Sequence, residues 1–81
     1  MTVVTLYGKP GCHLCEEARA AVAAAARDRR FELRELDVSA DPRLNARYGE
    51  RIPVVEVDGV EVAELHVDAA GLRGALDRVG A

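Results

Sequence analysis

The two cysteines of the chain, Cys12 and Cys15, are separated only by His13 and Leu14. A pair at this spacing can act as a dithiol, in which one thiolate attacks a disulfide and the second thiol resolves the mixed disulfide. The same spacing also supplies part of many zinc sites, and free cysteines are often simply small buried side chains. The surrounding residues therefore have to separate a redox couple from a metal site and from core packing.

Cys12 follows the turn residues Pro10 and Gly11 and stands directly before a stretch of helix formers. Unpaired backbone N–H groups and the helix dipole favour negative charge at such a position, and Lys9 adds a positive charge close by. We therefore expect Cys12 to be the nucleophile, with its thiolate tuned by Lys9.

Cys15 lies nearly one helical turn after Cys12, on the same side but deeper, which predicts a resolving role. His13 has two interpretations, since it could tune the Cys12 thiolate or simply be exposed. A structural zinc site usually needs four ligands, and the candidates are Cys12, His13, Cys15 and His66. Because adjacent Cys12 and His13 rarely bind one ion together, we expect no metal site, whereas a cluster shared between two subunits stays open.

The composition is that of a soluble globular protein, with 49% apolar and 31% charged residues. We expect one domain covering residues 1–81, and a monomer. The net charge of −3 argues against a nucleic-acid partner. No apolar run is long enough to span a membrane, and the first residues lack the pattern of a signal peptide. We therefore expect a cytoplasmic protein, in which a permanent structural disulfide is disfavoured.

Apolar periodicity and turn residues divide the chain into seven elements. Strands are predicted at 3–7 and 31–38, helices at 13–29 and 69–79, a helix from Pro42 to a left-handed end at Gly49, and a hairpin within 52–65. Asp41 and Asp68 are the expected N-caps of the last two helices. The order β-α-β-α-β-β-α predicts an α/β fold with a mixed four-stranded sheet and helices on both faces.

Two of the predicted strand regions carry more detailed expectations. The apolar phase shifts between Leu33 and Leu36, which predicts a bulge or two-sided burial in the strand at 31–38. In the hairpin, Asp58-Gly59 predicts a two-residue turn. The resulting register pairs Val57 with Val60, Val55 with Val62 and Glu56 with Glu61, so that the two glutamates need solvent or a nearby arginine.

With these elements and the cysteine pair, the chain resembles the glutaredoxin-like branch of the thioredoxin superfamily. The resemblance covers nearly the whole chain and depends on "LYGKPGCHLCEEA" followed by "RIPVVEVDG". It implies a thioredoxin fold and a small thiol–disulfide oxidoreductase that reduces protein or mixed disulfides. It also implies that Ile52–Pro53 is cis and faces the dithiol, with the backbone of Ile52 pairing with substrate. Lys9 would then lie near the thiolate or a substrate carboxylate.

Other parts of the pattern depart from glutathione-using relatives. Arg43 and Arg47 are either glutathione contacts or solvated helix charges, and the region after the hairpin reads "VAELHVDAAG" without the usual Gly-Gly. Only Asp68 is left there, and N-capping explains it. We therefore expect no cofactor, a protein disulfide as substrate and an unidentified reductant, with glutathione or another small thiol open as co-substrate. The alternative is a non-catalytic metal- or iron–sulfur-binding module, or a partner-docking domain.

Overall fold

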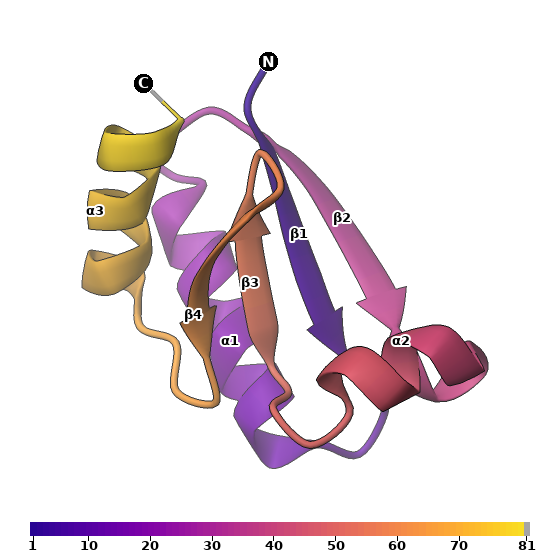
Figure 1. The fold of residues 1–81 in the computed structure, drawn as a ribbon. Helices are drawn as coiled ribbons and strands as arrows, with labels where there is room; N and C mark the ends of the chain where they lie inside the picture. Colours follow the sequence, from indigo (N-terminus) through magenta and orange to yellow (C-terminus); the bar gives the residue numbers. More distant parts are fainter. Residues whose placement is uncertain (81) are drawn as a thin grey trace.

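The computed structural model describes residues 1–80 and contains one mixed sheet and three α-helices (Figure 1). The strands are β1 (Val3–Gly8), β2 (Glu32–Asp37), β3 (Val54–Val57) and β4 (Val60–Glu64), and the helices are α1 (His13–Ala25), α2 (Pro42–Tyr48) and α3 (Ala69–Val79), with a 3-10 turn at Val38–Ala40. The sheet order is β2-β1-β3-β4, with β1 and β2 parallel and the other pairs antiparallel. This confirms the predicted α/β element order and mixed sheet.

Alternation along the central strands sends one set of side chains into the main core. Val4 and Leu6 of β1 are at most 3% exposed and pack with residues of β3, α1 and α3. The apolar face of α1 consists largely of alanine, so this helix can lie close to the sheet. Helices α1 and α3 also contact each other, and both lie on this side of the sheet.

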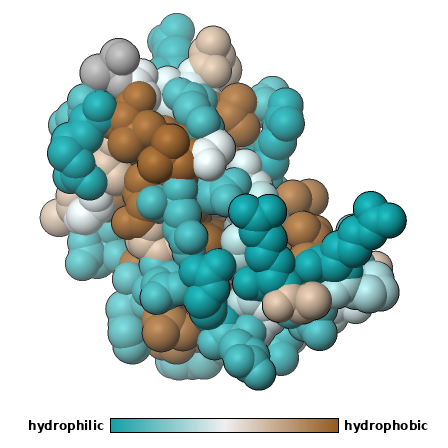
Figure 2. All heavy atoms as spheres, in the orientation of Figure 1, coloured by the Kyte–Doolittle hydropathy of each residue, from teal (hydrophilic) through white to brown (hydrophobic). Residues whose placement is uncertain are grey.

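The opposite side of the sheet is covered only near one end. There, Tyr48 of α2 packs against Tyr7 of β1 and Val54 of β3. Further along, the register places Thr5 between Arg34 and Glu56, and this polar row explains why no helix covers the rest of the face. Hydrophilic residues cover most of the view, and hydrophobic ones show as separate patches between them (Figure 2).

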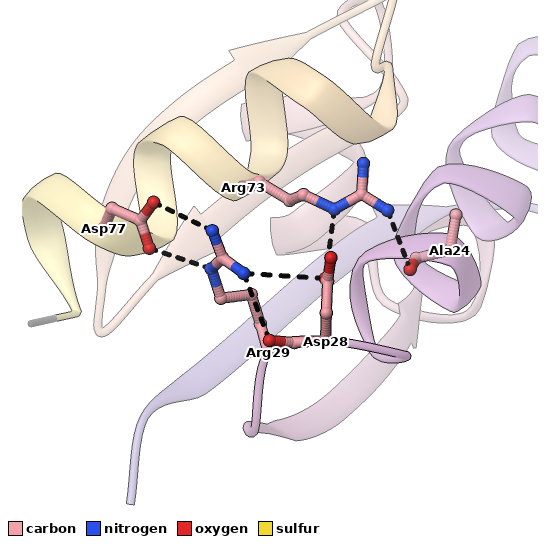
Figure 3. A network of polar contacts seen from close by, with 5 residues as sticks. All are labelled: Ala24, Asp28, Arg29, Arg73 and Asp77. Atoms are coloured by element: carbon pink, nitrogen blue, oxygen red, sulfur yellow. Dashed lines mark hydrogen bonds and ion pairs between the residues drawn. The ribbon is translucent and has the colours of Figure 1, made fainter.

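Polar contacts join the end of α1 to α3 (Figure 3). The Arg73 side chain donates to the backbone oxygen of Ala24 at 3.1 Å and to the carboxylate of Asp28 at 3.0 Å. Arg29 donates through two nitrogens to the carboxylate of Asp77 at 2.9 and 3.1 Å. Arg73 therefore adds a side-chain hydrogen bond to a carbonyl group at the end of α1 that also accepts from the backbone N–H of Arg27.

The strand predicted at 31–38 is confirmed as β2, but the bulge or two-sided burial expected within it is wrong. All six of its residues are exposed, and its register with β1 runs without interruption from Val3↔Glu32 to Gly8↔Asp37. The change of apolar phase between Leu33 and Leu36 has a simpler cause. Strand β2 is at the edge of the sheet, and these two leucines lie on its opposite faces, 42% and 41% exposed. An edge strand next to an uncovered face does not need a continuous apolar stripe.

The bulge lies in the hairpin instead. Val57 pairs with Val60 and Glu56 with Glu61, as predicted, but Val55 pairs with Ala63 because the register shifts between Val55 and Glu56. The predicted pairing of Val55 with Val62 is therefore wrong. The turn itself is confirmed, since Asp58 and Gly59 both have positive φ angles, 49° and 83°.

The helix ends agree with the sequence in part. Asp41 and Asp68 are N-caps as predicted, accepting from the backbone N–H groups of Arg43 and Gly71. Helix α1 ends at Ala25, four residues before the predicted end, and continues as turns. Gly49 has a φ of −54°, so its predicted left-handed conformation is wrong. Within residues 1–80, no helix combines the length and apolar character needed to cross a membrane.

Candidate functional site

The start of α1 holds both thiols. Cys12 is the N-cap, and its sulfur accepts a hydrogen bond from the backbone N–H of Cys15 at 3.3 Å. Cys12 is partly exposed and Cys15 is fully buried, and neither forms a disulfide. One thiol at the surface with a second thiol behind it is the arrangement that attack and resolution require.

Burial distinguishes Cys15 from an ordinary thiol. Loss of solvent raises the pKa of Cys15 to about 11, and its hydrogen bond with Cys12 acts in the same direction. The backbone N–H of Lys9 and the charge of Arg19 lower the pKa in part. Near neutral pH Cys15 is therefore protonated, which makes it a poor first nucleophile.

Gly8 at the end of β1 provides the space for this buried sulfur. A Cβ atom built on Gly8 would lie 3.0 Å from Sγ of Cys15. The glycine thus has a steric reason in addition to marking the end of the strand. The sequence contained the signal, a glycine directly after the apolar run, but the contact depends on how α1 crosses β1.

The two residues predicted to tune the Cys12 thiolate lie at the surface, Lys9 before Cys12 and His13 directly after it. Lys9 and His13 are both exposed, and His13 is the first residue of α1. Between them, Gly11 has a φ of 76°, a conformation that suits glycine, so it lets the chain turn into the helix. The backbone N–H of Lys9, unlike burial, lowers the pKa of Cys15. The tuning roles of the Lys9 and His13 side chains stay predictions.

The Ile52–Pro53 bond is cis, as predicted. Ile52 belongs to a buried group that we call the thiol cluster: Tyr7, Cys15, Val38, Tyr48, Ile52 and Val54, with Cys12 and Leu44 packed against it. The carbonyl oxygen of Pro53 accepts from the backbone N–H of Leu65 at 2.8 Å. The fold thus brings Ile52 to the cysteines, and its contact with substrate stays a prediction.

The remaining candidates lie further out. Arg43 is exposed on α2, and the guanidinium of Arg47 lies 5.3 Å from the ring centroid of Tyr48. Asp68 caps α3 as described, and His66 is exposed in the loop before that helix. Among residues 1–80, no three His, Cys, Asp or Glu side chains come together as a potential metal site.

One polar group near the thiols has no counterpart among the predicted site residues. The rings of Tyr7 and Tyr48 are stacked at 4.1 Å, and both hydroxyls donate to the carboxylate of Glu56, at 3.0 and 3.1 Å. Burial raises the pKa of Tyr7, and its interactions with Tyr48 and then Glu56 act in the same direction, so its hydroxyl stays protonated and donates. We call Tyr7, Tyr48 and Glu56 the tyrosine cluster. These three residues lie on β1, α2 and β3, so only the fold shows that they form a cluster.

Comparison with protein families gives a match over most of the chain. Residues 3–77 match the family described as Glutaredoxin-like domain (DUF836). An uncharacterised protein of Mycobacterium tuberculosis is 31% identical over 80 residues, covering 93% of this chain and 82% of that protein. These matches agree with the resemblance in the sequence.

Solved structures show the same fold. A structural-genomics target protein from X. campestris is 36% identical, with a TM-score of 0.77 over 94% of this chain and 97% of that chain. A protein from Nitrosomonas europaea is 29% identical, with a TM-score of 0.77 over 91% and 88%. A thioredoxin from Halobacterium salinarum, 22% identical with a TM-score of 0.72 over 95% and 73%, shares the fold alone.

Proposed function

Because the chain belongs to the glutaredoxin-like domain family, we propose that it is a small dithiol thiol–disulfide oxidoreductase, with Cys12 as nucleophile and Cys15 as resolving thiol. The observation that carries this proposal is the unequal burial of two adjacent thiols at the start of α1. A partly exposed thiol can meet a substrate, and a buried thiol whose own backbone N–H bonds to the exposed sulfur can complete the reaction.

The reaction has two exchange steps. The Cys12 thiolate attacks one sulfur of a substrate disulfide, forms a mixed disulfide and releases the other substrate sulfur as a thiolate. Cys15 then loses its proton and attacks Cys12, which forms the Cys12–Cys15 disulfide and transfers an electron pair to the remaining substrate sulfur. The substrate is reduced by two electrons, the protein is oxidised by two, and an external thiol reductant returns the protein to the dithiol.

The substrate we propose is a protein disulfide. Ile52 reaches the thiol cluster, and its backbone can offer strand-like hydrogen bonds to an extended segment of substrate. Lys9, exposed beside Cys12, can contact a carboxylate or the approaching sulfur. Strand β4 ends at Glu64, and Leu65 and His66 follow it where close backbone approach by a small ligand would favour glycine.

Trapping tests the function and identifies the substrate class. A Cys15→Ser protein should hold a mixed disulfide through Cys12, because the resolving thiol is gone. Disulfide-linked proteins recovered from a lysate should be released by reductant, and a matched Cys12→Ser protein should recover none. Equal recovery with both variants would contradict the assignment of the nucleophile.

Direct chemistry provides a second test. The purified, reduced protein should become oxidised with loss of two hydrogens and reduce a stoichiometric amount of disulfide. A protein that instead purifies with bound metal or an iron–sulfur colour, and that reduces no disulfide, would support the binding-module alternative.

A further inference from the structure

Cys15 lines a small pocket at the carboxyl ends of β1 and β2. The pocket has a volume of about 160 Å³, and its lining includes Gly8, Cys15 and four charged residues: Lys9, Arg19, Glu35 and Asp37. Cys12 is not among these lining residues. The buried sulfur therefore has a second side, next to charged groups of α1 and β2.

Helix geometry places Arg19, one of the two cations that line this pocket with Lys9. Arg19 follows Cys15 by four residues on α1, so the two side chains lie one turn apart on the same side of the helix. Nε of Arg19 lies 3.4 Å from a carboxylate oxygen of Glu35 on β2, and the two side chains are 42% and 45% exposed. The positive charge of Arg19 thus stays at the pocket and is paired with Glu35, and Asp37 is the other acid in the pocket lining.

We propose that Arg19 stabilises the thiolate of Cys15 during resolution and that Glu35 moderates this effect by pairing with Arg19. The inference rests on the proposed function, because only a resolving thiol has to ionise. In this step the Cys15 proton leaves to water in the pocket, the S–S bond between Cys12 and the substrate breaks, and the Cys12–Cys15 bond forms. The electron pair goes to the departing substrate sulfur.

Cys15 has to become charged during resolution, although its side chain has no contact with bulk solvent. Burial opposes this ionisation, while a nearby cation and the backbone N–H of Lys9 favour it. Because the ion pair of Arg19 is partly exposed, salt should weaken the effect. A rise of one unit in the thiol pKa lowers the resolving rate by only about threefold, since the rarer thiolate is more nucleophilic.

Single-turnover kinetics separate this effect from the first attack. Reduced protein is mixed with the uncharged probe dipyridyl disulfide, and release of pyridinethione is followed by absorbance. The fast first phase reports attack by Cys12, and the second phase reports resolution by Cys15. We expect Arg19→Gln to slow the second phase about threefold and to leave the first phase close to that of the parent protein.

Three variants make the test specific to charge. Arg19→Lys should restore the second phase, and Glu35→Gln should accelerate it, because the cation then loses its partner. Arg34→Gln removes a neighbouring cation of β2 that pairs with Glu32 on the other face of the sheet, so it should leave both phases unchanged. High salt should reduce the difference between the parent protein and Arg19→Gln.

The possible failures are distinguishable. If the parent protein shows no first phase, or a first phase without resolution, the proposed function is wrong. If both phases are present and Arg19→Gln resolves at the parent rate, only the role of Arg19 is overturned. Equal slowing by Arg19→Lys and Arg19→Gln would also overturn it, because the effect would then not be one of charge.

Discussion

At the scale of single residues, the backbone N–H of Cys15 donates to the sulfur of Cys12, and the two thiols differ in their contact with solvent. Cys12 caps α1 and is partly exposed, while Cys15 is buried beneath β1. Gly8 and the backbone of Lys9 surround the buried sulfur, so the end of β1 determines both its space and its hydrogen bonding. Reactivity at this site thus depends on a strand end as much as on the cysteines.

Alkylation should distinguish the two cysteines. Cys12 should be labelled first near neutral pH, because Cys15 is buried and its pKa is raised to about 11. In a Cys12→Ser protein, labelling of Cys15 should increase as the pH rises toward that value, since only the thiolate reacts. Peptide mass spectrometry after timed alkylation measures both rates, and faster labelling of Cys15 in the parent protein would reverse the assignment.

A second residue-scale prediction concerns Gly8. Gly8→Ala should destabilise the protein by about 1–3 kcal/mol, because the added Cβ would crowd Sγ of Cys15. Denaturant unfolding measures the loss. In a Cys15→Ala background the same substitution should cost less, since the sulfur is absent, and this double-mutant cycle isolates the contact. An equal cost in both backgrounds would contradict the steric explanation.

At the scale of elements, the tyrosine cluster connects the segments that carry the site. Tyr7 lies at the end of β1, just before the cysteine loop, and Tyr48 ends α2, just before the segment that leads to Ile52. The shared carboxylate of Glu56 ties both to β3. The backbone N–H of Arg51 also bonds to the carbonyl oxygen of Tyr48 at 2.8 Å. The stacked rings and the two hydrogen bonds to Glu56 thereby hold α2 against the sheet.

Substitution of Tyr48 should show this dependence. Tyr48→Ala should lower the free energy of unfolding by about 3–5 kcal/mol, because it removes a buried ring. Tyr48→Phe should cost only about 1 kcal/mol, since it keeps the stack with Tyr7 and loses one hydrogen bond. Arg43→Ala, on the exposed side of α2, is the control and should change little. Chemical denaturation followed by circular dichroism measures all three.

At the scale of the whole molecule, helices α1 and α3 pack on one side of the sheet, while α2 covers only one end of the other (Figure 1). The uncovered part carries charged residues, and Arg51 pairs with Glu61 and Glu64 along the β4 edge. Of the two glutamates that the hairpin places opposite each other, Glu61 pairs with this arginine, while Glu56 accepts from the hydroxyls of Tyr7 and Tyr48. The end of this face that α2 covers is the end that holds the thiol cluster, and the open part lies further along the strands.

We expect this molecule to reduce protein disulfides faster than glutathione mixed disulfides. The loop after β4 lacks glycine, and Glu64 would repel an anionic ligand. Turnover with a disulfide-bonded protein and with a glutathione mixed disulfide, under one common reductant, measures the preference. Robust glutathione-coupled turnover that depends on Lys9 would contradict this prediction.

The sequence by itself determined the features that depend on local chemistry. N-capping by Asp41 and Asp68, the Asp58-Gly59 turn and the start of α1 after Cys12 all follow from neighbouring residues, and the structure confirms them. The element order and the mixed sheet followed from apolar periodicity. The cis form of Ile52–Pro53 came from family resemblance, since proline alone does not specify it.

The tertiary structure alone decided the features that depend on contacts between distant segments. Three features arise from how strands and helices pack: the hairpin bulge, the exposure of β2 and the close approach of Gly8 to Cys15. The residue pattern of a single strand does not encode them. The tyrosine cluster joins residues 7, 48 and 56, and Arg19 meets Glu35 across α1 and β2. Side chains so far apart in the chain become neighbours only when packing fixes the distance and direction between their elements.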